Sequence, residues 1–425
     1  MTRVGIIGAG ISGLQLALRL QQLGVAATVY SPQDADGLRG GRPRSFPARF
    51  APTQERERRL GVAAWDFPDA QVHHWSVTLH DAGPRPAFSG RLVPPSSVVD
   101  FRLYLPHLLN AFTDRGGALE VGEPTVAEVS RRHELTVVAN GSRSVRELFP
   151  PVPERSPYTT PQRVLCSGVY FGFAEPLPHS LDIHFLPGAG EILRMPFHTP
   201  AGRADVLGIE AVPGGPLEAI SRVDPEADPK AFHRQVLDLV AQYAPSLREQ
   251  ADTGAFSLIG PGEVARGGIT PVVRRGWVPL GDDRCALAIG DAWITNDPLT
   301  AQGANLGSRS AFTLAELIAA APGPLGEEFC RSASAALWDH ARHVVAWSNA
   351  FLAEPEPQVT EVFAEAARDP RVADAFISSL HDPVGMWRTL ATPEGAAAFL
   401  ARHRGPGPAP EPPAARPHPA ESRPG

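Results

Sequence analysis

Three glycines near the amino terminus have the spacing of a phosphate-binding turn. Gly8, Gly10 and Gly13 follow a short apolar stretch and precede a run of leucines at helical spacing. Glycines at these positions permit a tight turn and let backbone amides approach a pyrophosphate at the start of a helix. Because the turn lies between a predicted strand and a predicted helix, it indicates a dinucleotide site rather than a plain glycine turn.

The ribose of such a dinucleotide is normally held by an acidic residue at the end of the second strand. In this chain that position is Ser31, and Asp34 follows three residues later. A serine hydroxyl can also bond a ribose, so we take Ser31 as the first candidate and Asp34 as the second.

A second block lies far along the chain, between Gly290 and Asn305. It contains Gly290-Asp291, Pro298 and Gln302-Gly303-x-Asn305, and it follows a predicted strand over residues 285–289. This order resembles the second FAD signature of flavoprotein monooxygenases. The resemblance implies that Asp291 bonds the ribityl chain, that Pro298 lies beside the isoalloxazine, and that residues 302–305 open a helix at the flavin.

Arginines in the loop after residue 31 are candidates for binding the pyrophosphate charge. The loop carries Arg39, Arg42, Arg44 and Arg49. Guanidinium groups pair with phosphate through two parallel hydrogen bonds, and related flavoproteins place an arginine there. We choose Arg42 for this role, and we expect Arg44 or Arg49 to face the pocket and to favour a substrate with a carboxylate.

Arg102 is a further cofactor candidate, on a helix predicted over residues 97–115. It could bond the flavin or lie on a dimer surface. An ion pair with Asp100 or Asp114 is an equally weighted alternative.

The elements that must position these residues divide the chain into four parts. Residues 3–30 predict a strand, a helix and a second strand, and the stretch after residue 150 alternates short strands with Pro and Gly turns. We predict a discontinuous dinucleotide-binding domain, a mostly antiparallel substrate domain, a helical region and a disordered Pro-rich tail. Their predicted ranges are residues 1–148 with 265–322, 149–264, 323–404 and 405–425, respectively.

Composition excludes several classes of partner and site. With 46 acidic and 39 basic residues the net charge is −7, which offers no overall field for nucleic acid or a membrane surface. Cys166, Cys285 and Cys330 are odd in number and widely spaced, which fits unpaired thiols in a reducing cytoplasm. Adjacent His73 and His74 on a strand point to opposite faces, so we expect no metal site.

The chain as a whole resembles the styrene and indole monooxygenases. The matching motifs occur in the family's order over roughly residues 3–320. Besides the block ending at Asn305, they are Trp65-Asp66-Phe67-Pro68, Gly83-Pro84-x-Pro86, Asp100-Phe101-Arg102-Leu103-Tyr104-Leu105-Pro106, Arg115-Gly116-Gly117 and Pro161-Gln162-Arg163.

This resemblance implies an α/β fold with a glutathione-reductase-like, Rossmann-type FAD-binding domain. It also implies that a separate NAD(P)H-dependent reductase delivers reduced FAD, which with O2 forms a C4a-hydroperoxyflavin that epoxidises or oxygenates an aromatic alkene or indole. Members commonly form homodimers, so a second copy of the chain is an expected partner. Phe171, Phe185, Met195 and Phe197 are candidates for lining the substrate pocket, with plain core packing as the alternative.

Two other functions remain open at this point. One is a single-component hydroxylase that oxidises NAD(P)H itself, although the chain has no second glycine fingerprint for a nicotinamide. The other is a flavin-binding pathway protein without turnover. A flavin-dependent halogenase is disfavoured because Lys230 is the only lysine of the chain and lies in a predicted helix of the substrate domain.

Overall fold

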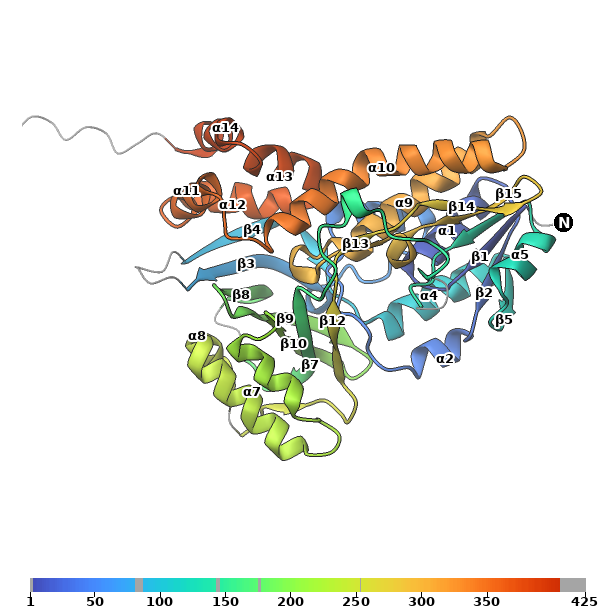
Figure 1. Cartoon of the computed structure of the whole chain (residues 1–425). Coiled ribbons are helices and arrows are strands. Elements are labelled where there is room, and N and C mark those ends of the chain that lie inside the picture. The colour runs from blue at the N-terminus through green and yellow to red at the C-terminus, as the bar shows by residue number, and fades with distance from the viewer. Residues whose placement is uncertain (1–2, 81–86, 143–145, 175–176, 253, 406–425) are drawn as a thin grey trace, which may run out of the picture.

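A computed structural model describes residues 3–80, 87–142, 146–174, 177–252 and 254–405. Two sheets lie in its interior, and a layer of carboxyl-terminal helices covers one side of both (Figure 1). The predicted α/β framework is therefore confirmed. The Gly83–Pro86 motif and nearly all of the predicted tail lie outside the described residues.

The first sheet has the strand order β14-β15-β6-β1-β2-β5. All neighbouring strands are parallel except β14 and β15, which form an antiparallel pair. Parallel strands end at the same edge of a sheet, so the residues that follow β1 and β15 come close together. The bounds are β1 Val4–Ile7, β2 Ala27–Ser31, β5 Ala118–Val121, β6 Leu135–Val138, β14 Trp277–Gly281 and β15 Arg284–Ala288.

Helices on both faces bury this sheet, because its strands are apolar on both sides. Helix α1 (Ile11–Gln22) packs against α9 (Gln302–Ala320) and α4 (Phe101–Asp114), so helices from three distant segments meet. Asp100 begins α4 by accepting a hydrogen bond from the Arg102 amide. The shorter helices are α2 Ala35–Arg39, α3 Ala51–Leu60 and α5 Val126–Arg132.

The second sheet has the order β11-β7-β10-β9-β8-β3-β4, with β12 also paired to β7. It is antiparallel except where β3 runs parallel to β8. The bounds are β3 Gln71–Leu79, β4 Ala87–Ser97, β7 Arg163–Phe171, β8 Ser180–Leu186, β9 Gly190–Thr199, β10 Gly202–Ala211, β11 Ser257–Leu258 and β12 Val264–Ile269. A separate two-stranded sheet joins β13 (Val272–Val273) to β16 (Ile294–Thr295).

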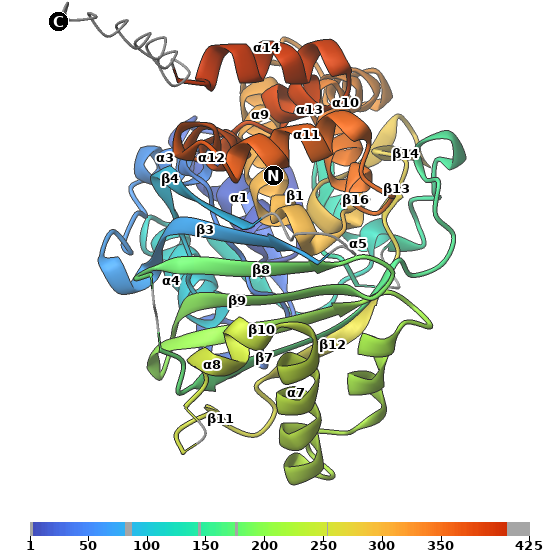
Figure 2. The same cartoon turned by 90° about the vertical axis from the view of Figure 1, so that its left-hand side faces the viewer.

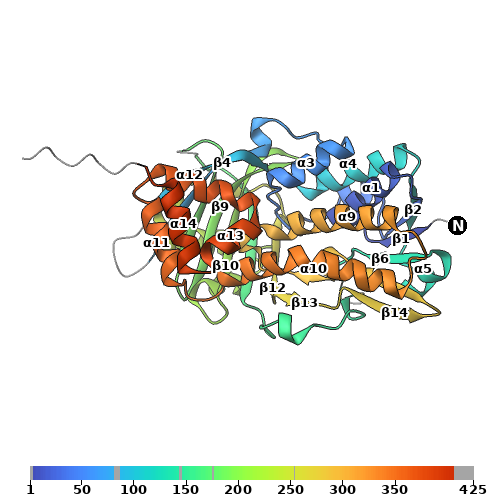
Figure 3. The same ribbon diagram turned by 90° about the horizontal axis from the view of Figure 1, so that it is seen from above.

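The two faces of the second sheet are covered by different helices, as Figure 2 shows. Helices α7 (Pro229–Tyr243) and α8 (Pro245–Gln250) pack on the outer face. The inner face meets the carboxyl-terminal helices, of which α10 lies beside α9 (Figure 3). These helices are α10 Glu327–Ala350, α11 Pro357–Ala366, α12 Pro370–Ser378, α13 Pro383–Leu390 and α14 Pro393–His403.

The two stretches assigned to the dinucleotide-binding domain from sequence both contribute strands to the second sheet. The first contains β3 and β4, and the second begins with residues 265–269, which belong to β12. Strand pairing between segments so far apart leaves no local signature, since an apolar alternation fits either sheet. None of the helices in the described ranges is both long enough and apolar enough to cross a bilayer.

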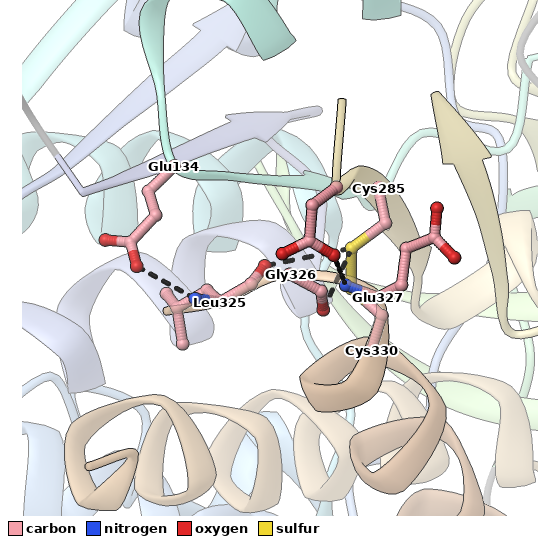
Figure 4. The surroundings of a disulfide bond; sticks show 7 residues. Glu134, Cys285, Leu325, Gly326, Glu327 and Cys330 are labelled. Carbon is pink, nitrogen blue, oxygen red and sulfur yellow. Dashed lines mark hydrogen bonds between the residues drawn. A yellow bond between two sulfur atoms is a disulfide. The ribbon is translucent and has the colours of Figure 1, made fainter. Parts of the chain in front are cut away.

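The prediction of unpaired cysteines was wrong for two of the three. A disulfide joins Cys285 on β15 to Cys330 on α10, whereas Cys166 is a buried free thiol. Figure 4 shows the bond beside the Leu325–Gly326 turn, where the Leu325 amide donates to Glu134 Oε1 at 2.8 Å. The two cysteines are 45 residues apart, so only the packing of α10 over β15 brings them together.

Candidate functional site

The turn between β1 and α1 has the geometry its glycines predict. Gly8 has φ +120°, in the region that favours glycine, and a Cβ on Gly13 would collide with the Gly8 carbonyl oxygen. Gly10 is the N-cap of α1 and makes no side-chain capping bond, and a Cβ built on it would meet open space. The first amides of α1 therefore face a space that an anion can enter.

Gly290 and Asp291 lie against this turn, although they are nearly 280 residues away in the sequence. They form a short 3-10 helix directly after β15. A Cβ on Gly290 would lie 2.6 Å from Ser12 Oγ, and a Cβ on Gly307 of α9 would collide with the same oxygen. Small residues thus let three segments approach one another at the carboxyl edge of the first sheet.

Asp291 has many protein atoms around it, yet its side chain is exposed to solvent. Its protein surroundings raise the pKa of its carboxyl, and the guanidinium groups of Arg146 and Arg274 act in the opposite direction. Neither arginine was predicted, because nothing in the sequence near residue 146 or 274 links those positions to the second block. The position thus offers a carboxylate for hydroxyl groups near two positive charges suited to phosphate.

The loop from Asn296 to Ala301 leads into α9. Pro298–Thr300 form a 3-10 turn, and Ala301 is a left-handed N-cap with φ 53° and no side-chain capping bond. A Cβ on Gly303 would meet open space, so the amides in the first turn of α9 are accessible. Together with the β1–α1 turn and Asp291, this second open helix end fits FAD, which needs sites for its pyrophosphate, ribityl chain and isoalloxazine.

Two predicted cofactor residues use their side chains within the protein. Asn305 accepts from the Phe50 amide at 2.9 Å and from Thr53 Oγ1 at 2.7 Å, and it donates to the Ala48 carbonyl at 2.9 Å. Gln302 donates to the Leu380 carbonyl at 3.3 Å. Their side chains fix the loop before α3 and the carboxyl-terminal helices against α9, so their contribution to a flavin site is indirect.

Ser31 and Arg42, two further cofactor candidates, also have partners within the protein. Ser31 Oγ donates to the Gln33 carbonyl at 2.6 Å at the carboxyl end of β2. Arg42 pairs with Glu226 at 2.6 Å, and both side chains are largely exposed.

Arg102 is held by two carboxylates. It forms paired hydrogen bonds with Asp100, as the alternative interpretation had it, and with Glu263 at 2.7 and 2.8 Å. These bonds tie the start of α4 to the turn before β12.

The expectation that Arg49 could face the pocket was wrong. Arg49 is fully buried, donates to Glu57 Oε1 at 2.8 Å and to Ser97 Oγ at 2.8 Å, and lies 4.1 Å from the centre of the Tyr104 ring. A hydrophilic loop sequence gave no sign of burial, because the partner carboxylate is supplied by α3. Arg44 is exposed.

An apolar cavity adjoins the loop that carries Pro298. It measures about 40 Å³ and lies between the inner face of the second sheet and the carboxyl-terminal helices. Leu299 and Thr300 belong both to this loop and to the cavity wall. The remaining wall residues are Trp75, Val77, Ile183, Phe185, Trp347, Phe351, Phe363, Phe376, Ile377 and Leu380.

Of the four residues predicted to line a substrate pocket, only Phe185 lies in this wall. Met195 and Phe197 are buried in the core between the sheet and the helices, where Phe197 packs edge-on against Phe46. Phe171 is 38% exposed at the end of β7. The prediction missed the helical half of the wall, because an apolar helix stripe such as that of α10 is indistinguishable from ordinary core packing in sequence.

Comparison with known proteins agrees with the arrangement of the two motifs. Residues 141–250 match the family model of the substrate-binding domain of styrene monooxygenase A. The chain is 30% identical over 400 residues to styrene monooxygenase StyA of a Pseudomonas species, an alignment that covers 92% of this chain and 96% of that protein.

Solved structures share the fold at lower identity. The flavin-dependent brominase Bmp2 superimposes with a TM-score of 0.67 at 14% identity, covering 94% of this chain and 98% of that chain. HpxO of Klebsiella pneumoniae, in complex with FAD and uric acid, gives a TM-score of 0.58 at 16% identity, covering 90% and 96%. These likenesses confirm the predicted fold class, and FAD is the cofactor that the site fits. The relatives in sequence show that the chain belongs to the styrene monooxygenase family of flavin-dependent monooxygenases.

Proposed function

We propose that this protein is the oxygenase component of a two-component system. A separate NAD(P)H-dependent reductase supplies reduced FAD, and the protein uses it with O2 to oxygenate a neutral aromatic alkene or an indole-like substrate. A homodimer is part of the same proposal, as in its family.

The observation that carries this proposal is the apolar cavity that shares Leu299 and Thr300 with the loop of Pro298. A site that transfers oxygen to an unactivated double bond has to hold an apolar molecule beside the flavin and keep water out. The cavity wall consists of aromatic and aliphatic side chains apart from Thr300, whose hydroxyl is bonded to Ser348 Oγ at 2.7 Å. At about 40 Å³ the cavity must widen to admit a substrate, which movement of the Phe351 ring at the end of α10 would allow.

The residues of the chain have distinct parts in this proposal. The turn of Gly8, Gly10 and Gly13 binds the pyrophosphate through backbone amides, and Asp291 accepts hydrogen bonds from the ribityl chain. The loop of Pro298 orients the substrate against the cofactor. When bound, reduced FAD supplies the two electrons that activate O2, so no protein nucleophile is required.

The wall of the cavity favours a neutral substrate over a carboxylate. None of the described residues that line it is charged, and burying an ionised carboxylate without a partner is costly. We therefore propose a neutral substrate in place of the carboxylated substrate that the positions of Arg44 and Arg49 in the sequence had led us to expect.

Although a brominase shares the fold, the position of Lys230 favours oxygen transfer over halogenation. Lys230 is exposed near the start of α7, which packs on the outer face of the second sheet. The apolar cavity lies on the inner face, so this lysine cannot carry an electrophile to a substrate there.

The direct test supplies chemically reduced FAD, O2 and a neutral substrate such as styrene or indole, and measures the oxygenated product. Cinnamate serves as the matched carboxylated compound, and turnover of the neutral compounds alone is expected. Anaerobic mixing of the FAD-loaded protein with NADPH tests the single-component alternative, and rapid bleaching of the flavin without a reductase would reject the two-component proposal. Release of peroxide without any product would indicate a flavin-binding protein that has lost turnover.

The variant Asp291→Ala tests the cofactor site. The substitution removes an exposed carboxylate without disturbing a core side chain. We therefore expect the protein to stay folded and to lose most of its affinity for FAD. Fluorescence titration with FAD measures this loss, and unchanged affinity would show that the flavin lies elsewhere.

A further inference from the structure

Three buried acidic side chains interact electrostatically where the second sheet meets the loop of Pro298. Glu191 on β9 and Glu210 on β10 are directly opposite each other in the sheet register, and Asp297 lies just before Pro298. All three are buried, with exposed fractions of 4%, 5% and 0%, respectively. Like charges opposite each other on a buried face are destabilising, so this arrangement requires an explanation.

One cation cannot neutralise three carboxylates. Arg163 on β7 holds Glu191 through two hydrogen bonds, of 2.7 and 2.8 Å. It is the cation that acts on Glu210 and Asp297 within the described part of the chain, and Tyr158 also interacts electrostatically with Asp297. Two carboxyl groups are therefore left beyond the neutral Arg163–Glu191 pair.

Each of these two groups has an oxygen without a hydrogen-bond partner among the described residues. They are Oε2 of Glu210 and Oδ2 of Asp297, whose other oxygen, Oδ1, accepts from the Leu299 amide at 3.2 Å. Two ionised carboxylates with unpaired oxygens would be strongly unfavourable in this interior, and one proton held by the two groups removes one of the charges.

We propose that Glu210 and Asp297 together hold one proton at neutral pH, and that this carboxyl pair is a proton source for oxygen transfer beside Pro298. The second part rests on the proposed function. Oxygenation of a substrate by O2 takes up two electrons and two protons: one oxygen atom joins the substrate, and the other leaves as water. When bound, reduced FAD would supply the two electrons and one proton, and the pair donates the second proton to the departing oxygen and is reloaded from solvent.

The acidity of the groups agrees with this role. Burial raises the pKa of Asp297 to about 6, while the Leu299 amide and Arg163 lower it and Glu191 raises it. Burial raises the pKa of Glu210 well above its usual range, with Asp297 and Glu191 acting in the same direction and Arg163 against them. A hydroxide-like leaving oxygen is a far stronger base than either carboxylate, so transfer to it is downhill.

Infrared spectroscopy of the flavin-free protein tests the shared proton itself. At neutral pH the wild type should show the carbonyl stretch of a buried protonated carboxyl group. Glu210→Gln should remove this band, and Asp297→Asn should shift it, because Glu210 stays protonated but loses its carboxylate partner. Asp34→Asn is the matched control, since Asp34 also caps a helix but is exposed, and it should leave the band unchanged. A wild type without the band, or a band indifferent to both variants, would overturn the proposal.

Single-turnover oxygenation with preloaded reduced FAD tests the role of the proton. Glu210→Gln should slow product formation about tenfold or more above neutral pH and change its pH profile, while its affinity for FAD stays within about twofold. An unchanged pH profile would overturn the catalytic part. Failure of the wild type to oxygenate any substrate would count against the proposed function alone, because the infrared result does not depend on turnover.

Discussion

Two buried charged clusters flank the candidate flavin site, and they differ in balance. Around Arg49, the one carboxylate, Glu57, is bonded to Arg49 and lies near a second cation, Arg56, and Glu57 Oε1 also accepts from Tyr104 at 2.8 Å. Beneath Pro298, three carboxyl groups face one cation among the described residues, Arg163. A carboxylate matched by cations stays ionised over a wide pH range, whereas carboxyl groups in excess take up protons. The comparison shows that buried charge can position a loop in one place and store a proton in another.

The cluster around Arg49 and Glu57 also links helices that are distant in the sequence. Gln15 on α1 donates to Tyr104 on α4 at 2.8 Å and accepts from Ser308 on α9 at 2.5 Å. Arg56 on α3 donates to the same Ser308 at 2.8 Å. These hydrogen bonds join the four helices that surround the glycine turn, so the loop before α3 is held in place whether or not a flavin is bound.

The largest effect is expected from Arg49→Ala. Removing this cation leaves Glu57 buried and uncompensated, which should lower the free energy of unfolding by about 3–5 kcal/mol. Urea denaturation at neutral pH measures the loss. The double variant Arg49→Ala with Glu57→Gln should recover part of it, and a loss below about 1 kcal/mol for the single variant would show that the cluster is not closed to water.

The three carboxyl groups beneath Pro298 should make the stability of the folded protein depend on pH. Because burial raises the pKa of Asp297 from 3.8 to about 6, the folded state holds a proton that the unfolded chain has released. Stability is therefore greatest below about pH 4 for this group, falls as the pH rises to about 6, and is then constant. The total loss from this group amounts to about 2–3 kcal/mol.

In Asp297→Asn this contribution disappears, so stability should fall less between about pH 4 and about pH 7 than in the wild type. Urea midpoints across this range measure the difference, and Asp34→Asn should keep the wild-type slope. Parallel curves for Asp297→Asn and wild type would place the proton on another group.

The smallest effect is expected from Arg42→Ala, which breaks an exposed ion pair with Glu226. Surface pairs contribute about 0–1 kcal/mol, and salt should reduce even this. The same variant tests the cofactor role chosen from sequence. A clear loss of FAD affinity with unchanged stability would show that Arg42 leaves Glu226 to bind phosphate.

The parts of the candidate site whose local geometry is visible in the sequence depend on local constraints. The β1–α1 turn needs glycines because of backbone geometry at Gly8 and the close approach at Gly13, and these needs are visible in the spacing itself. The strand before Gly290 and the helix after Ala301 are likewise visible as an apolar run and a periodic stripe.

The parts that were missed depend on partners from distant segments. Asn305 matches a cofactor motif, but its side chain forms hydrogen bonds with the loop before α3. Arg102 forms hydrogen bonds with Asp100 and with Glu263, which is over 160 residues away in the sequence. Contacts between distant segments also explain why Cys285 pairs with Cys330 and why β3 and β4 belong to the second sheet. The type of a side chain limits what it can bind, but the fold decides which partner lies next to it.

The class of fold, the two flavin motifs and the family could be predicted from the residues, because turn glycines, strand periodicity and motif order are properties of short stretches of chain. The place of the apolar cavity, the burial of particular charges and the electrostatic interaction of Asp297 with Glu210 and Glu191 depend on tertiary packing. Burial and proximity create the energetic cost of a charge, and neither exists until strands and helices from distant segments have packed together.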